Sequence, residues 1–359
     1  MNRTKWVVAA IGCFMVVNSG AMAQIAPAEA VKPATPEKEA VRVGTGSMTI
    51  SGLLQGWYQF TDSATPADDT FRLRRAEIKL SGEVDPAVAW AVMIDPAQVR
   101  EDDVTTATGT NLVTSVGRKS VLQDFLVTYK LDSANSLDVG QYKTPFGMEG
   151  LESSAKLDLI ERSMMASQLK WADYRDVGVT YKGNFTCPFT GAKIQPTAGI
   201  YNGEGQNKLD GNNPMAYAGR LVVKPVESLH LGVSHYNGEK GSGSAAKDDN
   251  RTGVEAKFTM DPVSVYGEYA TGESGGKDKE EWYATVTCNL GDAYQAVARY
   301  DWYDADKNTD NDARTETTVG LNYFIKKHNA KLAANYVVVG EEGASVDNDI
   351  VRVLAQVSF

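Results

Sequence analysis

The chain has 359 residues, of which 42% are hydrophobic and 23% are charged, so it is long enough for one large domain or two small ones. Glycine is abundant, with 33 residues, and tyrosine outnumbers phenylalanine and tryptophan, a profile that favours many short strands over a helical bundle. Beyond the N-terminus no apolar run approaches the roughly 20 residues that a membrane helix needs, which leaves a closed barrel as the way into a membrane.

The N-terminus has the three parts of a secretory signal peptide. Arg3 and Lys5 are positively charged, residues 6–17 form an apolar core, and Ala-Met-Ala at 21–23 fits the small-residue cleavage pattern. We therefore expect residues 1–23 to be removed. The remaining chain has 34 basic residues against 46 acidic residues, which is a net charge of about −12.

Residues 24–46 are rich in Ala, Pro, Glu and Lys and cannot bury a core, so they are predicted to form a flexible periplasmic leader. Alternating segments follow over residues 47–359. The alternation is clearest in the last nine residues, where one face consists of Val351, Val353, Ala355, Val357 and Phe359. Sixteen strand candidates begin near residues 47, 71, 88, 121, 136, 174, 193, 216, 229, 250, 263, 280, 294, 314, 330 and 349.

Short turns and long loops are predicted to alternate strictly along these candidates. Residues 85–86 and 291–292 are short connections, whereas 96–120 and 144–173 are long. Outer-membrane barrels have short periplasmic turns and long external loops, a rhythm that a soluble sandwich does not require. The sequence therefore predicts an all-β fold, a 16-stranded antiparallel transmembrane β-barrel with both termini in the periplasm.

A basic cluster lies at residues 71–80. The alternation slips between Arg74 and Arg75, which predicts a β-bulge. With that slip, both arginines and Arg72 face water while Leu73 faces lipid, because charge on the lipid face costs about 2–4 kcal/mol at the midplane. Guanidinium groups in a pore attract anions and offer forked donors to phosphate or carboxylate. The alternative is that these arginines pair with carboxylates of the barrel wall.

Other basic residues recur on the inward-facing register of later strands. Acidic residues gather in the predicted outer loops, so the negative net charge is compatible with a locally basic pore. The further basic candidates for the lumen are Lys143, Lys182, Arg220, Lys224, Lys257, Arg299 and Arg352.

The third long loop, residues 144–173, differs from the others. Gly147 to Gly150 would let the chain turn inward, and residues 153–169 are predicted to form a short helix. A barrel of this size is not filled by its own side chains, so a loop folded inward would set the narrowest point. The alternative is a surface helix outside the barrel. The apolar side of the predicted helix consists of Leu157, Ile160, Met164 and Met165.

No metal site, cofactor site or catalytic motif is predicted. Residues 304–312 match the first half of a calcium loop but lack its Gly and final Glu, so an exposed acidic loop is expected. Three histidines without a Cys/His cluster argue against zinc. Cys187 and Cys288 remain in the mature chain, and the sequence leaves their pairing open.

Several motifs resemble the phosphate-selective porins O and P. They are FRLRRA at 71–76 with LSGEV at 80–84, GQYKTPFG at 140–147, and YRDVGV at 174–179. The resemblance covers the N-terminal half, and the rest of the chain follows by its strand rhythm and its terminal phenylalanine.

The resemblance implies a trimeric sixteen-stranded barrel whose third loop folds inward and whose constriction binds phosphate-like anions through Arg and Lys. The motif match extends this role to Arg72, Arg74, Arg75 and Lys143. The loop-borne candidates, by position only, are Lys156, Arg162, Lys170 and Arg175.

We therefore predict a diffusion channel in the outer membrane of a Gram-negative bacterium that favours small anions such as phosphate. The alternatives are a general or other nutrient-specific porin without anion selectivity, and a barrel adhesin or enzyme. The expected partners are outer-membrane lipid, lipopolysaccharide, a homotrimer, and the barrel assembly machinery through Phe359. Nucleic acid is not an expected partner.

Overall fold

The computed structural model describes residues 41–43, 46–61, 69–98, 121–343, 346 and 348–359. The predicted signal peptide and most of the predicted leader lie outside these residues. The unit Arg42–Phe359 is compact by itself and consists almost entirely of strands. None of the described helices is long and apolar enough to cross a membrane.

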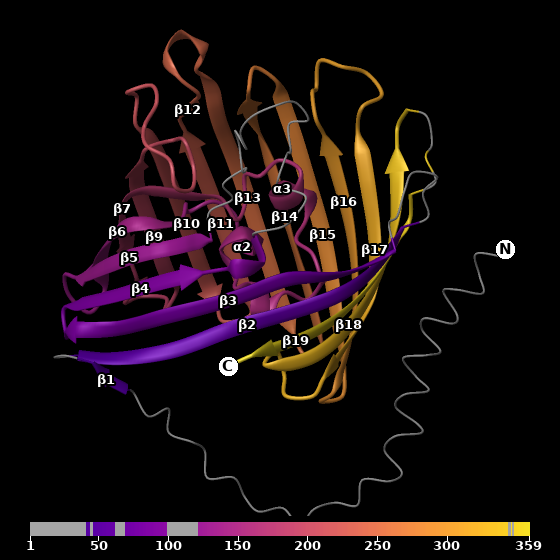
Figure 1. Cartoon of the computed structure of the whole chain (residues 1–359), viewed down its shortest axis with the longest axis horizontal. Coiled ribbons are helices and arrows are strands. Elements are labelled where there is room, and N and C mark those ends of the chain that lie inside the picture. Colours follow the sequence, from indigo (N-terminus) through magenta and orange to yellow (C-terminus); the bar gives the residue numbers. More distant parts are fainter. Residues whose placement is uncertain (1–40, 44–45, 62–68, 99–120, 344–345, 347) are drawn as a thin grey trace, which may run out of the picture. The chain divides into compact units, whose positions relative to one another are not determined.

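Sixteen long strands of the described chain pair in antiparallel fashion into one sheet (Figure 1). The sheet closes on itself because β9 pairs with β10 and β19 pairs with β2. Each strand begins within three residues of its predicted start, so the predicted barrel is confirmed. The strands are β2 (Gly46–Thr61), β3 (Thr70–Asp85), β4 (Val88–Ile94), β5 (Leu122–Lys130), β6 (Asn135–Lys143), β7 (Arg175–Gly183), β9 (Lys193–Tyr201), β10 (Ala216–Val226), β11 (Leu229–Asn237), β13 (Lys247–Met260), β14 (Val263–Ser274), β15 (Asp278–Leu290), β16 (Tyr294–Asp304), β17 (Arg314–Phe324), β18 (Ala330–Glu341) and β19 (Ile350–Ser358).

The other elements are short. They are the strands β1 (Val41–Val43), β8 (Phe185–Thr186) and β12 (Glu239–Lys240), the helices α2 (Met148–Leu151) and α3 (Met164–Ser167), and the 3₁₀ turns η1 (Pro96–Gln98), η3 (Ser154–Lys156) and η4 (Gly243–Ala245).

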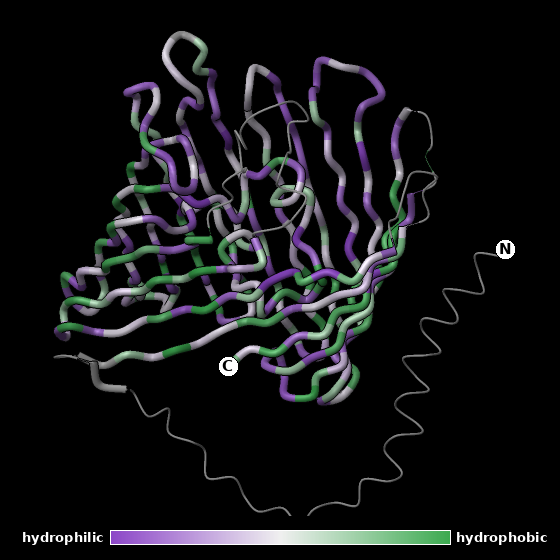
Figure 2. Tube along the Cα trace, viewed as in Figure 1, coloured by the Kyte–Doolittle hydropathy of each residue, from purple (hydrophilic) through white to green (hydrophobic). Residues whose placement is uncertain are grey.

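The barrel is apolar outside and polar inside. On β15 the outward side chains include Trp282 and Val286, which are 38% and 43% exposed, whereas the inward Glu281 and Thr285 are at most 1% exposed. Figure 2 shows that the long loops at the top are largely hydrophilic. A soluble barrel has the opposite arrangement, so this pattern fits a strand surface that faces lipid.

The bulge predicted in the basic cluster is present. Gln55 of β2 pairs with Arg75, and the next residue, Gly56, pairs with Leu73, so Arg74 is the extra residue of β3. The bulge adds one residue to β3, so the alternation of β3 shifts at this point. The side chains before and after the bulge therefore stay on the same faces as their partners in β2. Phe71 and Leu73 are therefore 85% and 75% exposed outside, while the neighbouring arginines point inward.

The predicted strict alternation of loop lengths is wrong at two connections. On the long-loop side, β14 and β15 are joined by Gly275, Gly276 and Lys277 alone, because both glycines adopt positive φ (67° and 79°) and allow a tight hairpin. On the opposite side, the connection between β7 and β9 is longer, since β8 pairs with the start of β9 and extends that hairpin.

Two predictions about side chains outside the pore can be compared with the structure. Cys187 and Cys288 are free thiols, which answers the question that the sequence left open. In the acidic loop, Asp306 lies 3.2 Å from Lys277, and Lys307 lies 2.8 Å from Glu280. Two lysines of this region therefore each pair with one of its carboxylates.

A charge on the outer face should destabilise the barrel far more than the same charge inside. Val254, in the middle of β13, is 51% exposed on the outer face. We expect Val254→Arg to lower the free energy of unfolding by about 2–4 kcal/mol in lipid vesicles. Thr259→Arg, on the inner face of the same strand, is the control and should change it by less than about 1 kcal/mol. Urea titrations measure both, and equal losses would contradict the assigned faces.

Candidate pore constriction

The third long loop, which joins β6 to β7, folds into the barrel as predicted. It turns inward at Gly147, whose φ is 72° and whose missing Cβ leaves room for a carboxylate oxygen of Glu268. A Cβ built there would lie 2.5 Å from that oxygen. Glycine is therefore required by both the backbone conformation and the close approach.

The single helix predicted over residues 153–169 is wrong. The structure has α2, η3 and α3, and the backbone between η3 and α3 bends at residues 158–161 without forming a helix. Barrel side chains bind that backbone directly: the side-chain oxygen of Asn335 accepts from the Ile160 amide (2.9 Å), and Lys331 donates to the Leu157 carbonyl (2.6 Å). These bonds replace those that a helix would form internally. The apolar side was nevertheless predicted correctly, since Leu157, Ile160, Met164 and Met165 are all at most 5% exposed.

Glu268 of β14 anchors the start of the loop. Its two carboxylate oxygens accept the amides of Met148 and Glu149 at 2.7 Å each, and the Tyr283 hydroxyl also donates to it. Glu149 in turn accepts the Ser163 amide at 2.7 Å, which joins α2 to the N-terminus of α3. A carboxylate that accepts several N–H groups holds them strongly, because each bond is charge-assisted.

Arg299 of β16 holds the far part of the loop. It is 4% exposed and donates to the carboxylates of Asp301 (2.6 Å) and Glu149 (3.2 Å). Its remaining N–H groups donate to the carbonyls of Glu161 and Arg162, both at 3.1 Å. One guanidinium thus satisfies two loop carbonyls and two carboxylates, which uses four of its five N–H donors.

Arg74, the bulged residue of the basic cluster, forms a two-point ion pair with the loop. Its Nε and Nη2 donate to the two oxygens of Glu161 at 2.6 and 3.1 Å, and its guanidinium lies 5.6 Å from the Trp57 ring centroid. Burial alone would raise the pKa of the Glu161 carboxyl, but Arg74 beside it lowers this pKa to about 2. Arg74 therefore holds the loop through an ion pair in which Glu161 neutralises its positive charge.

Asp173, near the end of the loop, gathers three other predicted site residues. It lies 2.8 Å from Lys143, 3.4 Å from Arg162 and 3.5 Å from Arg175, and Arg175 also binds Asp124 at 2.8 Å. Burial alone would raise the pKa of Asp173, but the cations, Arg162 and Lys143 first among them, hold it well below its ordinary value. These ion pairs join the two ends of the loop where it leaves β6 and enters β7.

The remaining four predicted residues are not drawn into these pairs. Arg75 donates to Gln55 at 2.7 Å and lies 3.6 Å from Glu77. Within the described chain, Arg72, Lys156 and Lys170 have no ion-pair partner, and both lysines are exposed. The structure thus brings together Arg74, Lys143, Arg162 and Arg175 at the loop, whereas Arg72, Arg75, Lys156 and Lys170 stand apart from that cluster.

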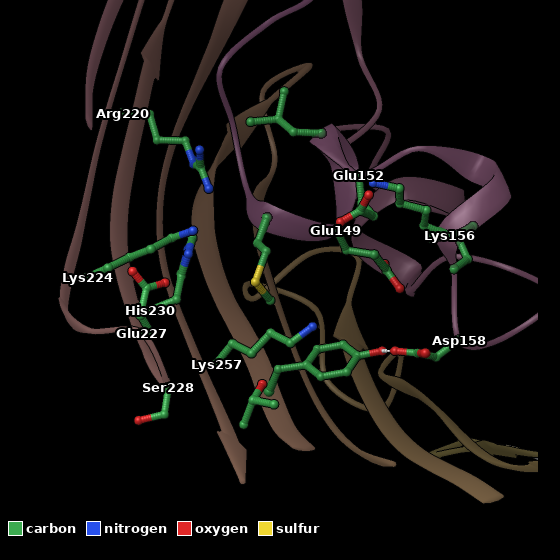
Figure 3. Close-up of a pocket in the computed structure, with 15 residues that line it drawn as sticks. Glu149, Glu152, Lys156, Asp158, Arg220, Lys224, Glu227, Ser228, His230 and Lys257 are labelled. Carbon is green, nitrogen blue, oxygen red and sulfur yellow. Dashed lines mark hydrogen bonds between the residues drawn. The ribbon is translucent and has the colours of Figure 1, made fainter. Parts of the chain in front are cut away.

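A cavity of about 450 Å³ separates the loop from strands β10, β11 and β13. Figure 3 shows Arg220, Lys224, His230 and Lys257, together with Glu227, on the strand side of this space, and Glu149, Glu152 and Asp158, together with Lys156, on the loop side. The charged or titratable residues that line it are Glu149, Glu152, Lys156, Asp158, Arg220, Lys224, Glu227, His230 and Lys257.

Some of these charges are already paired. Glu227 lies 2.6 Å from Lys193. Arg220 and His230 both bind Glu255, the latter at 2.6 Å, and Glu149 is held by Arg299 as described above. These pairs remove charge that a passing solute would otherwise meet.

The other charges of the cavity have no ion-pair partner in the ranges that the structure describes. They are Lys224 and Lys257 on the strands, and Glu152, Lys156 and Asp158 on the loop. Lys257 lies 5.0 Å from the Tyr266 ring centroid, and the hydroxyl of that tyrosine donates to Asp158 at 2.9 Å. Unpaired lysines therefore exceed unpaired carboxylates by one.

A second cavity, of about 530 Å³, lies against β2 to β7 on the other side of the loop. Its cations are largely paired, with Lys182 bound to Asp138 and Arg175 bound to Asp124. Lys79 has no ion-pair partner among the described residues of this cavity.

Sequence reasoning did not identify the acidic side chains of the inner wall. Glu255, Glu268, Glu281 and Asp301 are each at most 5% exposed, and three of them hold the loop or neutralise a basic residue of the lumen. These acidic residues could have been found from their position on the inward faces of the alternating strands. That criterion was applied only to the basic residues.

A family model described as phosphate-selective porin O and P matches residues 54–262 of the chain. No curated protein matches the chain. Many solved structures share its fold. The outer-membrane channel DcaP of Acinetobacter baumannii is 14% identical, with a TM-score of 0.62 over 89% of this chain and 99% of that one.

An anion-selective porin from Comamonas acidovorans is 13% identical, with a TM-score of 0.61 over 88% of this chain and 100% of that one. OmpF of Salmonella typhi, in complex with daunomycin, is 12% identical, with a TM-score of 0.62 over 89% and 100%. At these identities the structures support the fold, a closed antiparallel barrel.

Removing Arg299 should release the loop and destabilise the barrel. Arg299→Met leaves two buried carboxylates without their cation, so we expect a loss of about 3–5 kcal/mol in the free energy of unfolding. Arg314→Met is the control, since Arg314 is one-third exposed and binds Glu316 on its own strand at 2.8 Å. It should cost about 1 kcal/mol or less. Denaturant titrations in vesicles compare the two, and similar losses would argue against an anchoring role for Arg299.

The pair between Arg74 and Glu161 predicts a dependence of stability on acid pH. The pKa of Glu161 is about 2 in the folded protein, below its ordinary value of 4.5. A carboxyl with a lowered folded pKa stabilises the folded state above its unfolded pKa and loses this effect as the pH falls. Stability should therefore decrease between pH 4.5 and about 2, and less steeply in Glu161→Gln. Urea midpoints across this range test it, and parallel slopes would refute the assignment.

Proposed function

The chain belongs to the phosphate-selective porin O and P family, and from this premise we propose that its pore favours small anions such as phosphate. The family and the closed barrel make the protein a channel of the Gram-negative outer membrane rather than an enzyme. The observation that carries the anion preference is the set of lysines around the first cavity that no carboxylate neutralises.

The local balance of charge supports a modest preference. Lys156, Lys224 and Lys257 are unpaired within the described chain, against Glu152 and Asp158. The selectivity of a pore follows the charges at its narrow part rather than the net charge of the chain. One excess positive charge in a water-filled cavity attracts anions without binding them tightly, which also suits a channel that must release what it admits.

The predicted site residues then divide into two roles. Arg74, Lys143, Arg162 and Arg175 act as positioning residues, because their charges are spent on Glu161, Asp124 and Asp173. Anions meet Lys156 with Lys224 and Lys257, and Arg72 and Lys170 add positive charge elsewhere, whereas Arg75 is buried and paired with Glu77. Ammonium groups are mobile point charges, so they suit transient contacts with phosphate.

Assembly as a trimer is part of the proposal. One similar structure, OmpT of Vibrio cholerae, is described as a trimer form, with a TM-score of 0.54 and 14% identity. Contacts with lipopolysaccharide, and recognition of Phe359 by the barrel assembly machinery, stay predictions. The exposed outer row of apolar side chains supports contact with membrane lipid.

Reversal potentials in a planar bilayer test the proposed function. In a potassium chloride gradient the wild type should show an anion bias, and added phosphate should reduce the chloride current. The double variant Lys224→Glu/Lys257→Glu reverses two unpaired charges, so its chloride-to-potassium permeability ratio should fall by about threefold or more. Lys326→Glu, in the exposed turn before β18 and outside the cavity, is the control. A cation bias in the wild type would overturn the proposal.

A further inference from the structure

The unpaired charges of the first cavity differ between its two sides: the strand side carries only lysines, whereas the loop side carries two carboxylates and Lys156 and is net negative. Lys224 and Lys257 project from β10 and β13, while Glu152 and Asp158 belong to the inward-folded loop across the space (Figure 3). The net excess of one lysine accounts for an anion preference but not for this separation. A pore that attracts anions alone has no need of unpaired carboxylates facing its lysines.

The carboxylates on the loop side are held in place by their backbones. The carbonyl of Glu152 accepts from Lys143 (3.1 Å) and Arg162 (2.8 Å), while its carboxylate accepts the Ser153 amide at 3.0 Å. The carbonyl of Asp158 accepts from Asn322 at 2.7 Å. Two residues whose main chains are fixed to their surroundings thus present carboxylates that lack a cation partner in the described chain.

The lysines on the strand side are fixed by the sheet. His230 of β11 pairs directly with Lys257 of β13, so both side chains point to the same inner face. The two acids nearest to them are engaged elsewhere, because Glu227 binds Lys193 and Glu255 binds Arg220 and His230. The ammonium groups of Lys224 and Lys257 therefore face the cavity without a carboxylate of their own.

We propose that this cavity favours zwitterionic solutes, small molecules that carry a carboxylate or phosphate at one end and an ammonium group at the other. This inference deepens the proposed function and rests on the same cavity. Such a solute places its anionic end toward Lys224 and Lys257 and its ammonium group toward Glu152 and Asp158. A volume of about 450 Å³ is within the range of small-molecule sites.

The preference follows from the cost of removing a charged solute from water. An inorganic anion forms favourable ion contacts on one side of the cavity only, and a neutral solute forms them on neither side. A zwitterion is compensated at both ends and is also oriented, since its dipole aligns with the field between the two sides. Each contact is partly hydrated and therefore weak, so the solute is admitted and released rather than retained.

Swelling of liposomes that contain the purified protein tests the preference. γ-Aminobutyrate is the zwitterionic probe, and butyramide is a neutral probe of similar length. We expect γ-aminobutyrate to enter about two- to fivefold faster than butyramide, the factor that one or two weak ion contacts provide. Equal rates, or a faster rate for butyramide, would overturn the inference.

Variants of the loop carboxylates separate this inference from the proposed function. Glu152→Gln/Asp158→Asn keeps the side-chain shapes and the acceptor for Tyr266 but removes both negative charges. It should abolish the advantage of γ-aminobutyrate and increase the chloride bias of the reversal potential. Asp310→Asn, in an exposed outer loop, is the control and should change neither.

The outcomes differ for the two claims. An unchanged zwitterion advantage in the double variant would contradict the role of the loop carboxylates. A wild-type chloride bias without any zwitterion advantage would remove this inference and leave the proposed function standing. A wild-type cation bias would remove the proposed function itself. Mobility of the folded and heated protein in gel electrophoresis shows that each variant forms the barrel before it is assayed.

Discussion

The loop of residues 144–174 brings backbone amides and carbonyls into the barrel, and each of these groups needs a hydrogen-bond partner there. The strand backbones cannot supply one, because neighbouring strands already use their N–H and C=O groups. The loop pairs some of these groups with one another, and inward side chains of the barrel pair others. Glu268 accepts the first loop amides, Arg299 donates to loop carbonyls, and Lys331 and Asn335 hold the stretch between them. The constriction depends on this match between a polar wall and a folded loop.

The strands and their faces follow from local pattern, and this is why they were predictable. Period-two alternation identifies a strand and its two faces together: Val357 was placed on one face of β19, and in the structure it is exposed outside the barrel, while its neighbour Gln356 is buried inside. The bulge at Arg74 was visible as a break in the same pattern. Loop length is less constrained, since paired glycines at 275–276 permit a hairpin where a long loop was expected.

The partners of the charged residues were not predictable, because they lie far apart in the sequence. Arg74 and Glu161 are separated by 87 positions, and Arg299 and Glu149 by 150. Their pairing depends on where the loop crosses the barrel, which no local period encodes. The same reason explains the wrong helix: residues 157–162 have helical composition, but Asn322, Lys331 and Asn335 bind their backbone in a non-helical, bent form.

Two populations of basic residues thus have different physical roles. Guanidinium groups suit the anchoring role, because a planar fork can satisfy several acceptors at once, as Arg299 and Arg74 do. Lysines suit the open wall, because an ammonium group on a flexible chain can follow a moving solute. Since the anchors are neutralised by Glu161, Asp173 and their neighbours, a single unpaired lysine or carboxylate changes the field of the cavity more than any paired arginine does. The net charge of −10 is consequently a poor guide to what the pore admits.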